Sequence, residues 1–258
     1  MKTISALCLV AVFLSAEASA VTVIGNAGTL GAIGVVTLPP TGDPSYGWVS
    51  TNGGAPGGGL PYIVPGINGG VGNTNGSTLR SDLFAANAGD NLQFYFNYVT
   101  SDGAGFADYG WARLLDASNN EIALLFTART KPSGSIIPGF GMPAPSATLT
   151  PVAVPIIGGA PAWAPLGISS GTCFTTGCGY TGWVQANYSI LSSGSYLLEY
   201  GVTNWSDTYY DSGLAFSGST IAGAPINTET TVPVPAAAWL FGSGFTVLMG
   251  AVRRKSRA

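Results

Sequence analysis

The stretch NLQFYFNYVT, residues Asn91–Thr100, decides the fold class of this chain. Its large apolar side chains stand at every second position: Leu92, Phe94, Phe96 and Tyr98. A period of two places these side chains on one face of a β-strand whose other face is more polar. The stretch therefore predicts a strand that lies with one face on a hydrophobic core.

Six further segments have the strand signals of β-branched and aromatic residues between Gly, Asn and Ser turns. They are residues 77–84, 110–116, 121–130, 182–190, 194–203 and 212–221. The turn-forming run 116–120 predicts a hairpin between the second and third of them. Because no internal window is typical of an amphipathic helix, the chain is expected to be all-β, with a jelly-roll-like β-sandwich as its architecture.

Two long stretches between these segments are expected to be irregular. Residues 52–78 are rich in Gly and Asn, and residues 131–171 contain eight prolines. The second stretch also contains Ile, Leu, Trp and Phe, which is too apolar a composition for a solvated linker. We expect it to pack over the sandwich and to include short strands of its own.

Composition excludes several function classes. Charged residues make up only 8% of the 258 residues, and the chain has no histidine. A nucleic-acid-binding protein needs a basic footprint that this chain lacks. Catalytic triads, metal sites and proton shuttles that depend on a histidine of this chain are likewise excluded.

The N-terminal 20 residues have the three parts of a secretory signal peptide. A cation at Lys2 precedes the apolar run 4–14, and Ala18-Ser19-Ala20 is a small-residue cleavage site. We expect cleavage after Ala20, with Ala18 as the competing site. The signal predicts export across the inner membrane.

The C-terminal region has the features of a second targeting signal. The motif Val232-Pro233-Val234-Pro235 precedes an uncharged run, 236–252, and a basic end, 253–258. The uncharged run has the minimum length of a transmembrane helix. The basic end is expected to lie in the cytoplasm, because Lys and Arg next to a membrane helix favour that side. We expect a signal peptide at 1–20, an ectodomain at 21–224, a linker at 225–235, a membrane helix at 236–252 and a cytoplasmic tail at 253–258.

The string VPVPAAAWLFGSGFTVLMGAVRRK at this end resembles a PEP-CTERM sorting tail, with Val234 where that family usually has Glu. The stretch TSDGAGFADYGWARL, residues 100–114, also resembles a segment common in PEP-CTERM proteins with uncharacterised bodies. The resemblance implies processing near Pro235 by an exosortase-type membrane enzyme. It also implies release to, or attachment at, the surface of a Gram-negative bacterium that makes exopolysaccharide.

The body between the two predicted targeting signals is acidic and has two cysteines. Between residues 21 and 235 there are four cations and eleven acidic residues. An acidic surface attracts cations and repels anionic partners such as DNA. Cys173 and Cys178 are predicted to form a local disulfide in an oxidising compartment, because two thiols are too few for a structural zinc site.

Two acidic loops lie at matching positions of a weak internal repeat. Val99-Thr100 and Val202-Thr203 are each followed, at the same spacing, by an Asp, a Gly and an Ala, so both loops are expected at one end of the sandwich. Their carboxylates and carbonyls are ligands that calcium prefers, although Asp and Gly also simply form turns. The candidate calcium ligands are Asp102, Asp108, Asp207 and Asp211.

The second acidic loop also has aromatic residues, Trp205, Tyr209 and Tyr210. Exposed rings beside hydrogen-bonding groups suit sugar recognition, because the apolar face of a sugar stacks on a ring. Large aromatic side chains also commonly fill a core. These three residues are therefore candidates for glycan binding or for core packing.

Three functions remain open. The leading hypothesis is a non-enzymatic surface or matrix protein that binds exopolysaccharide. The second is a structural envelope protein without a ligand. The third is a glycoside hydrolase that uses paired carboxylates, either Asp102 with Asp108 or Glu199 with Asp211, since such chemistry needs no histidine.

Overall fold

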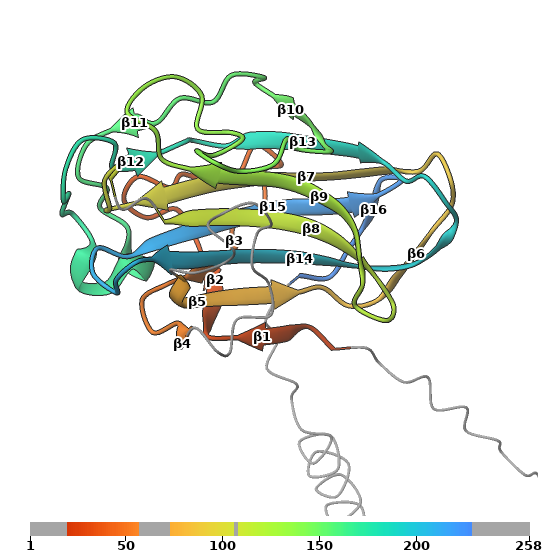
Figure 1. Ribbon diagram of the computed structural model, residues 1–258. Helices are drawn as coiled ribbons and strands as arrows, with labels where there is room; N and C mark the ends of the chain where they lie inside the picture. Colours follow the sequence, from red (N-terminus) through yellow and green to blue (C-terminus); the bar gives the residue numbers. More distant parts are fainter. Residues whose placement is uncertain (1–19, 57–72, 106–107, 229–258) are drawn as a thin grey trace, which may run out of the picture.

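The alternating stretch forms β7 (Asn91–Thr100), and its four even-numbered apolar side chains are fully buried. The computed structural model describes residues 20–56, 73–105 and 108–228. In these residues β7 lies inside one of two antiparallel sheets that pack face to face (Figure 1). The predicted all-β sandwich is therefore confirmed.

The first sheet is built around β14. Its strand order is β1 (Thr22–Ile24), β5 (Asn73–Arg80), β14 (Gly194–Trp205), β8 (Tyr109–Asp116) and β9 (Glu121–Arg129). Two short strands join it, β4 (Ala55–Pro56) on β5 and β6 (Phe84–Ala86) on β14. The turn at 116–120 joins β8 to β9 as the predicted hairpin.

The second sheet is built around β7 and β15. Its strand order is β10 (Thr148–Thr150), β13 (Val184–Ser189), β7, β15 (Ser212–Ile221), β3 (Tyr46–Ser50) and β2 (Asn26–Leu30). Three short strands join it, namely β11 (Ile157–Gly158), β12 (Gly179–Tyr180) and β16 (Ala224–Pro225).

The core between the sheets is rich in stacked rings. Phe96 of β7 stacks on Phe126 of β9, with ring centroids 3.7 Å apart. Tyr200 of β14 stacks on Phe216 of β15 at 4.1 Å. Each pair joins one sheet to the other, so the aromatic residues of the alternating strands hold the two layers together.

One predicted strand is corrected, and the predicted irregular stretch 52–78 is shorter than expected, because residues 55–56 and 73–78 lie in β4 and β5. The segment 77–84 is not continuous, because β5 ends at Arg80 and β6 begins at Phe84. Ser81 causes the break: its N–H donates to the Leu198 carbonyl, and its Oγ accepts from the Leu198 N–H. The hydroxyl thus takes over a backbone pairing position while the chain turns away.

The proline-rich segment packs on the sandwich and contains β10 and β11, as expected, together with a short 3₁₀ helix, η3 (Ala164–Ser169), that was not predicted. Trp163, only 1% exposed, anchors it by donating from Nε1 to the Tyr46 hydroxyl at 3.0 Å. At the other end of the chain the folded body continues past residue 224, because Ile226 is buried and its N–H donates to the Ser219 carbonyl.

The predicted targeting segments at the two ends of the chain lie outside the described residues. This applies to residues 1–19 of the signal peptide, the Val232–Pro235 motif, the membrane helix 236–252 and the tail 253–258. Among the residues that are described, no helix has the length and apolar character needed to cross a bilayer.

Four segments of the chain meet at one end of the sandwich. They are the residues that follow β3, the first residues after β7, the segment between β11 and β12, and the turn from β14 to β15. In Figure 1 this is the end at which η3 lies. We call it the loop end, and it comprises residues 51–54, 101–105, 163–178 and 206–211.

Candidate functional site

The structure brings the two acidic loops together at the loop end, as the internal repeat predicts. Ser101 donates to the Asp211 carbonyl from its N–H at 3.2 Å and from its Oγ at 2.8 Å. The Trp205 N–H donates to Asp108 Oδ1 at 2.9 Å. Each loop therefore holds the first residues of the other.

Asp108 is a buried clamp between the sheets. Its second oxygen, Oδ2, accepts from the Ser212 hydroxyl at 2.7 Å, and the residue is only 1% exposed. Burial raises the pKa of this carboxyl well above its usual range, and the nearby charge of Asp102 raises it further. Both oxygens are engaged by the protein itself.

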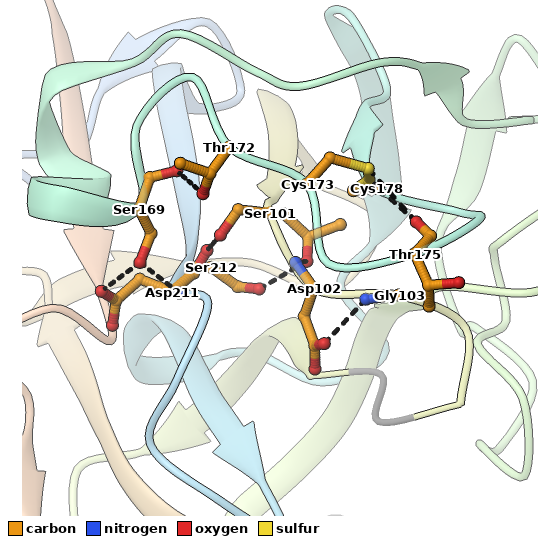
Figure 2. Close-up of a disulfide and its surroundings, with 11 residues drawn as sticks. Ser101, Asp102, Gly103, Ser169, Thr172, Cys173, Thr175, Cys178, Asp211 and Ser212 are labelled. Atoms are coloured by element: carbon orange, nitrogen blue, oxygen red, sulfur yellow. Dashed lines mark hydrogen bonds between the residues drawn. A yellow bond between two sulfur atoms is a disulfide. The ribbon is translucent and has the colours of Figure 1, made fainter.

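Asp211 is a second clamp, which joins its own loop to the segments that contain Thr51 and Ser169; Figure 2 shows its contact with Ser169. Oδ1 accepts from Thr51 Oγ1 at 2.9 Å, and Oδ2 accepts from Ser169 Oγ at 3.0 Å. Burial raises the pKa of the Asp211 carboxyl, while these hydroxyl donors act in the opposite direction. The side chain ties the loops together and presents no free oxygen.

Asp102 and Asp207 differ from the two clamps. Asp102 is 2% exposed; Oδ1 accepts from the Gly103 N–H at 2.7 Å, and no described residue donates to its buried Oδ2. Burial raises the pKa of Asp102 to about 7, and the charge of Asp207 contributes to the rise. Half-buried Asp207 accepts from the Tyr209 N–H at 2.8 Å, which forms a local turn.

These contacts bear on the predicted calcium site. Of the four candidate ligands, only Asp102 and Asp207 keep carboxylate oxygens that no described residue engages. Within residues 20–56, 73–105 and 108–228, no three Asp, Glu, Cys or His side chains are grouped as metal ligands. Calcium takes six to eight oxygens, among them carbonyl and water oxygens, so a site at Asp102 and Asp207 would need further oxygen ligands of those kinds.

The three predicted aromatic residues separate into two environments. Tyr209 is 73% exposed, and Tyr210 is half-buried. Trp205 is 8% exposed; the Arg129 guanidinium lies 4.8 Å from its ring centroid, and the Tyr109 ring packs beside it. The structure thus places Trp205 in a buried cluster and leaves the two tyrosines for a surface role.

One residue that the sequence did not single out joins the tyrosines. Phe174 is 47% exposed, and its ring centroid lies 5.0 Å from that of Tyr210. We call Phe174, Tyr209 and Tyr210 the apical patch. The position of Phe174 between two bridged cysteines is the signal that would have identified it.

The predicted disulfide joins Cys173 to Cys178, whose Cα atoms are 5.7 Å apart. The loop that it closes lies along the first acidic loop (Figure 2). The Phe174 N–H donates to the Ser101 carbonyl, and the Ala104 N–H donates to the Thr176 carbonyl, both at 3.0 Å. The bridge therefore fixes the segment that presents Phe174.

Replacing both cysteines with serine is expected to lower the free energy of unfolding by about 2 kcal/mol, because a closed loop of this length restricts the unfolded chain by about that amount. Urea unfolding of oxidised wild type, reduced wild type and the double variant measures it. Reduced wild type is expected to match the variant. A variant as stable as oxidised wild type would contradict the prediction.

The second predicted carboxylate pair is not brought together. Glu199 lies within β14, opposite Arg80 on one neighbouring strand and Arg113 on the other. It is fully buried, and it forms ion pairs of 2.6 Å with both arginines. Asp211 instead bonds Thr51 and Ser169 at the loop end. The two acids share no partner.

The apical patch, held on a clamped and disulfide-stapled end, is thus the feature of the described residues that best suits recognition. A scan against models of known protein families finds no match for this chain, and no curated protein is significantly similar to it.

Proposed function

We propose that this protein is an exported surface or extracellular-matrix protein that binds polysaccharide through the apical patch and has no enzymatic activity. The observation that carries the proposal is the exposed Tyr209 beside the Phe174–Tyr210 pair on a rigid end of the sandwich. The export signal and the sorting tail in the sequence support the proposed location, with processing by an exosortase-type enzyme and membrane attachment before it.

The chemistry of the patch favours a sugar polymer. Aromatic rings offer flat apolar surfaces to the faces of sugar rings, and Asp207 beside them can accept from sugar hydroxyls. Two non-glycine residues of this loop, Ser206 and Tyr210, have left-handed φ values of 71° and 58°. Such conformations are uncommon and cluster at sites where a side chain must be held in place.

The strand order supports the proposed jelly roll. One sheet contains the sequence β5-β14-β8-β9, and the other contains β13-β7-β15-β3. Two four-stranded antiparallel sheets joined by crossing connections are the pattern of the jelly roll, an architecture that lectin domains share. This likeness concerns architecture alone, so the sugar proposal rests on the patch.

The acidic residues support a binding role over glycoside hydrolysis. Asp108 and Asp211 each have both oxygens engaged by protein donors, so neither can meet a substrate. Glu199 is held between two arginines. A hydrolase would need a proton donor and a second carboxylate that both reach the bond being cleaved.

Retention of the full-length protein on insoluble exopolysaccharide of the producing bacterium tests the proposal. Retention that Tyr210→Ala weakens would support it. A matched run with chelator tests calcium, because loss of retention there would assign the ion to Asp102 and Asp207. No retention in either buffer would overturn the proposal and favour a structural envelope protein without a ligand.

Replacing Tyr209 with alanine is expected to weaken binding to the polysaccharide about tenfold, because one stacking surface is lost while the fold is untouched. Depletion of soluble protein by increasing amounts of polymer measures the affinity. Leu191→Ala is the matched control, since Leu191 is 76% exposed and follows β13 at the opposite end. Equal losses of affinity in the two variants would show that Tyr209 is not part of the binding site.

A further inference from the structure

A cavity of about 580 Å³ lies on the second sheet, away from the loop end. It is lined by the connection between β2 and β3, by the last residues of β15, and by the chain around β16, and it is open to solvent on one side. From Asp211 to Ser219, β15 spans roughly 25 Å, so the cavity is far from the apical patch. In Figure 1, β16 lies toward the end of the sandwich opposite η3.

An irregularity in β15 shapes this cavity. The pairing of β15 with β7 shifts between Ser217 and Thr220, and Gly218 between them has a φ of +63°. A Cβ at Gly218 would overlap with Thr41 Cγ2. Glycine therefore allows both the backbone turn and the close approach of the 39–43 segment that forms one wall. Bulges of this kind often re-aim side chains next to functional sites.

The polar groups of the cavity are only partly engaged by the protein. Asp43 Oδ2 accepts from Thr41 Oγ1 at 2.6 Å and from Ser217 Oγ at 3.1 Å. No described residue donates to Asp43 Oδ1. Gln93 and Thr220 face each other as a cross-strand pair, and neither side chain forms a hydrogen bond with a described residue. An amide, a hydroxyl and a carboxylate oxygen thus remain available to a ligand.

The charge of the lining restricts the class of ligand. Among its described residues, the lining contains the carboxylate of Asp43 and no Lys or Arg, so nothing there would neutralise an anion. The other lining groups are hydroxyls, amides and the apolar surfaces of the exposed residues Pro44 and Pro225. Paired apolar and hydrogen-bonding surfaces of this kind suit a neutral polyhydroxylated molecule, and the volume lies within the range of small-molecule sites.

We infer that this cavity binds a neutral sugar unit, with Asp43 and Gln93 bonding its hydroxyls. The inference extends the proposed function by a second site, and it stands whether or not the apical patch binds polymer. A separate site for one or two sugar units would recognise a chain end or a side branch, while the apical patch would contact the length of a polymer.

Titration of the full-length protein with glucose, galactose, mannose and rhamnose, monitored by ligand-observed NMR, tests the inference. Binding of at least one neutral sugar is expected, weakened about tenfold by Asp43→Ala and by Gln93→Ala. Asp116→Asn, a half-buried acid at the end of β8, is the control and should leave binding unchanged. Unfolding midpoints of all variants confirm that they fold.

The charged sugars glucuronate and glucosamine complete the experiment. Tighter binding of glucuronate, or of glucosamine, than of any neutral sugar would overturn the assignment to a neutral ligand. Failure of every neutral sugar to bind, or equal affinity of the Asp43→Ala variant, would overturn the site. Tyr209→Ala separates the two sites, because it should weaken polymer retention and leave the titration with small sugars unchanged.

Discussion

Replacing Glu199 with glutamine is expected to lower the free energy of unfolding by about 3–5 kcal/mol, because removing one partner of a buried ion pair leaves its counter-charges uncompensated. The carboxylate is fully buried in β14 and lies 2.6 Å from both Arg80 Nε and Arg113 Nε. Trp111 Nε1 also donates to it, at 3.3 Å. Glutamine keeps the shape but leaves two guanidinium charges without their shared anion.

Urea unfolding of wild type and variants measures the effect. Glu121→Gln is the matched control: it removes a charge 3.7 Å from the same Arg113, at a side chain that is 32% exposed. Its expected cost is below about 1 kcal/mol, because solvent screens that pair. Replacing Arg80, Glu199 and Arg113 together with methionine, leucine and methionine should recover most of the loss. A Glu199→Gln cost no larger than the control would contradict this account of the triad.

The stability of the wild-type protein is expected to fall as the pH rises from about 4 to 7. Burial raises the pKa of Asp102 to about 7 in the folded protein, whereas the unfolded chain releases this proton near pH 4. Across that interval the folded state binds more protons than the unfolded state, so raising the pH favours unfolding. The raised pKa values of Asp108 and Asp211 act in the same direction.

The Asp102→Asn variant isolates the contribution of one carboxyl. It is expected to match wild type at pH 4 and to be more stable at pH 8, by at most about 4 kcal/mol. Chemical unfolding at the two pH values measures the difference. Asp116→Asn is the control, since hydrogen bonds from Asn120 and Ser118 lower the pKa of Asp116 and give its contribution the opposite sign. A variant less stable than wild type at pH 8 would contradict the prediction.

Strand positions followed from the sequence where side chains alternate. β7 begins and ends at the predicted residues, because its large apolar side chains have a clear period of two. β15 also has the predicted bounds, although its alternation is limited to Leu214 and Phe216 before the irregularity at Gly218. β2 and β3 were missed, since NAGTL and YGWVS are only five residues long and each is interrupted by a glycine. Strand order was not predictable, because the pairs that define it, such as Glu199 with Arg80, are 119 residues apart.

The candidate site was predictable in location and less so in its details. Repeated spacing indicated that the two acidic loops share one end, and the bonds between Ser101 and Asp211 join them there. Composition could not show that Asp108 and Asp211 point inward, because their donors Ser212, Thr51 and Ser169 come from three separate segments. Phe174 and the cavity beside Asp43 depend on the same long-range packing.

The central place of β15 determines when this protein can fold. Sheet order puts β15 between β7 and β3, although it is the last long strand in the described part of the chain. Before residues 212–221 are present, β2 and β3 have no partner that links them to the rest of the second sheet. An N-terminal fragment that ends before β15 can form the β8–β9 hairpin but cannot close the sandwich. Folding therefore waits for nearly the whole body, as expected for a topology dominated by distant strand pairs.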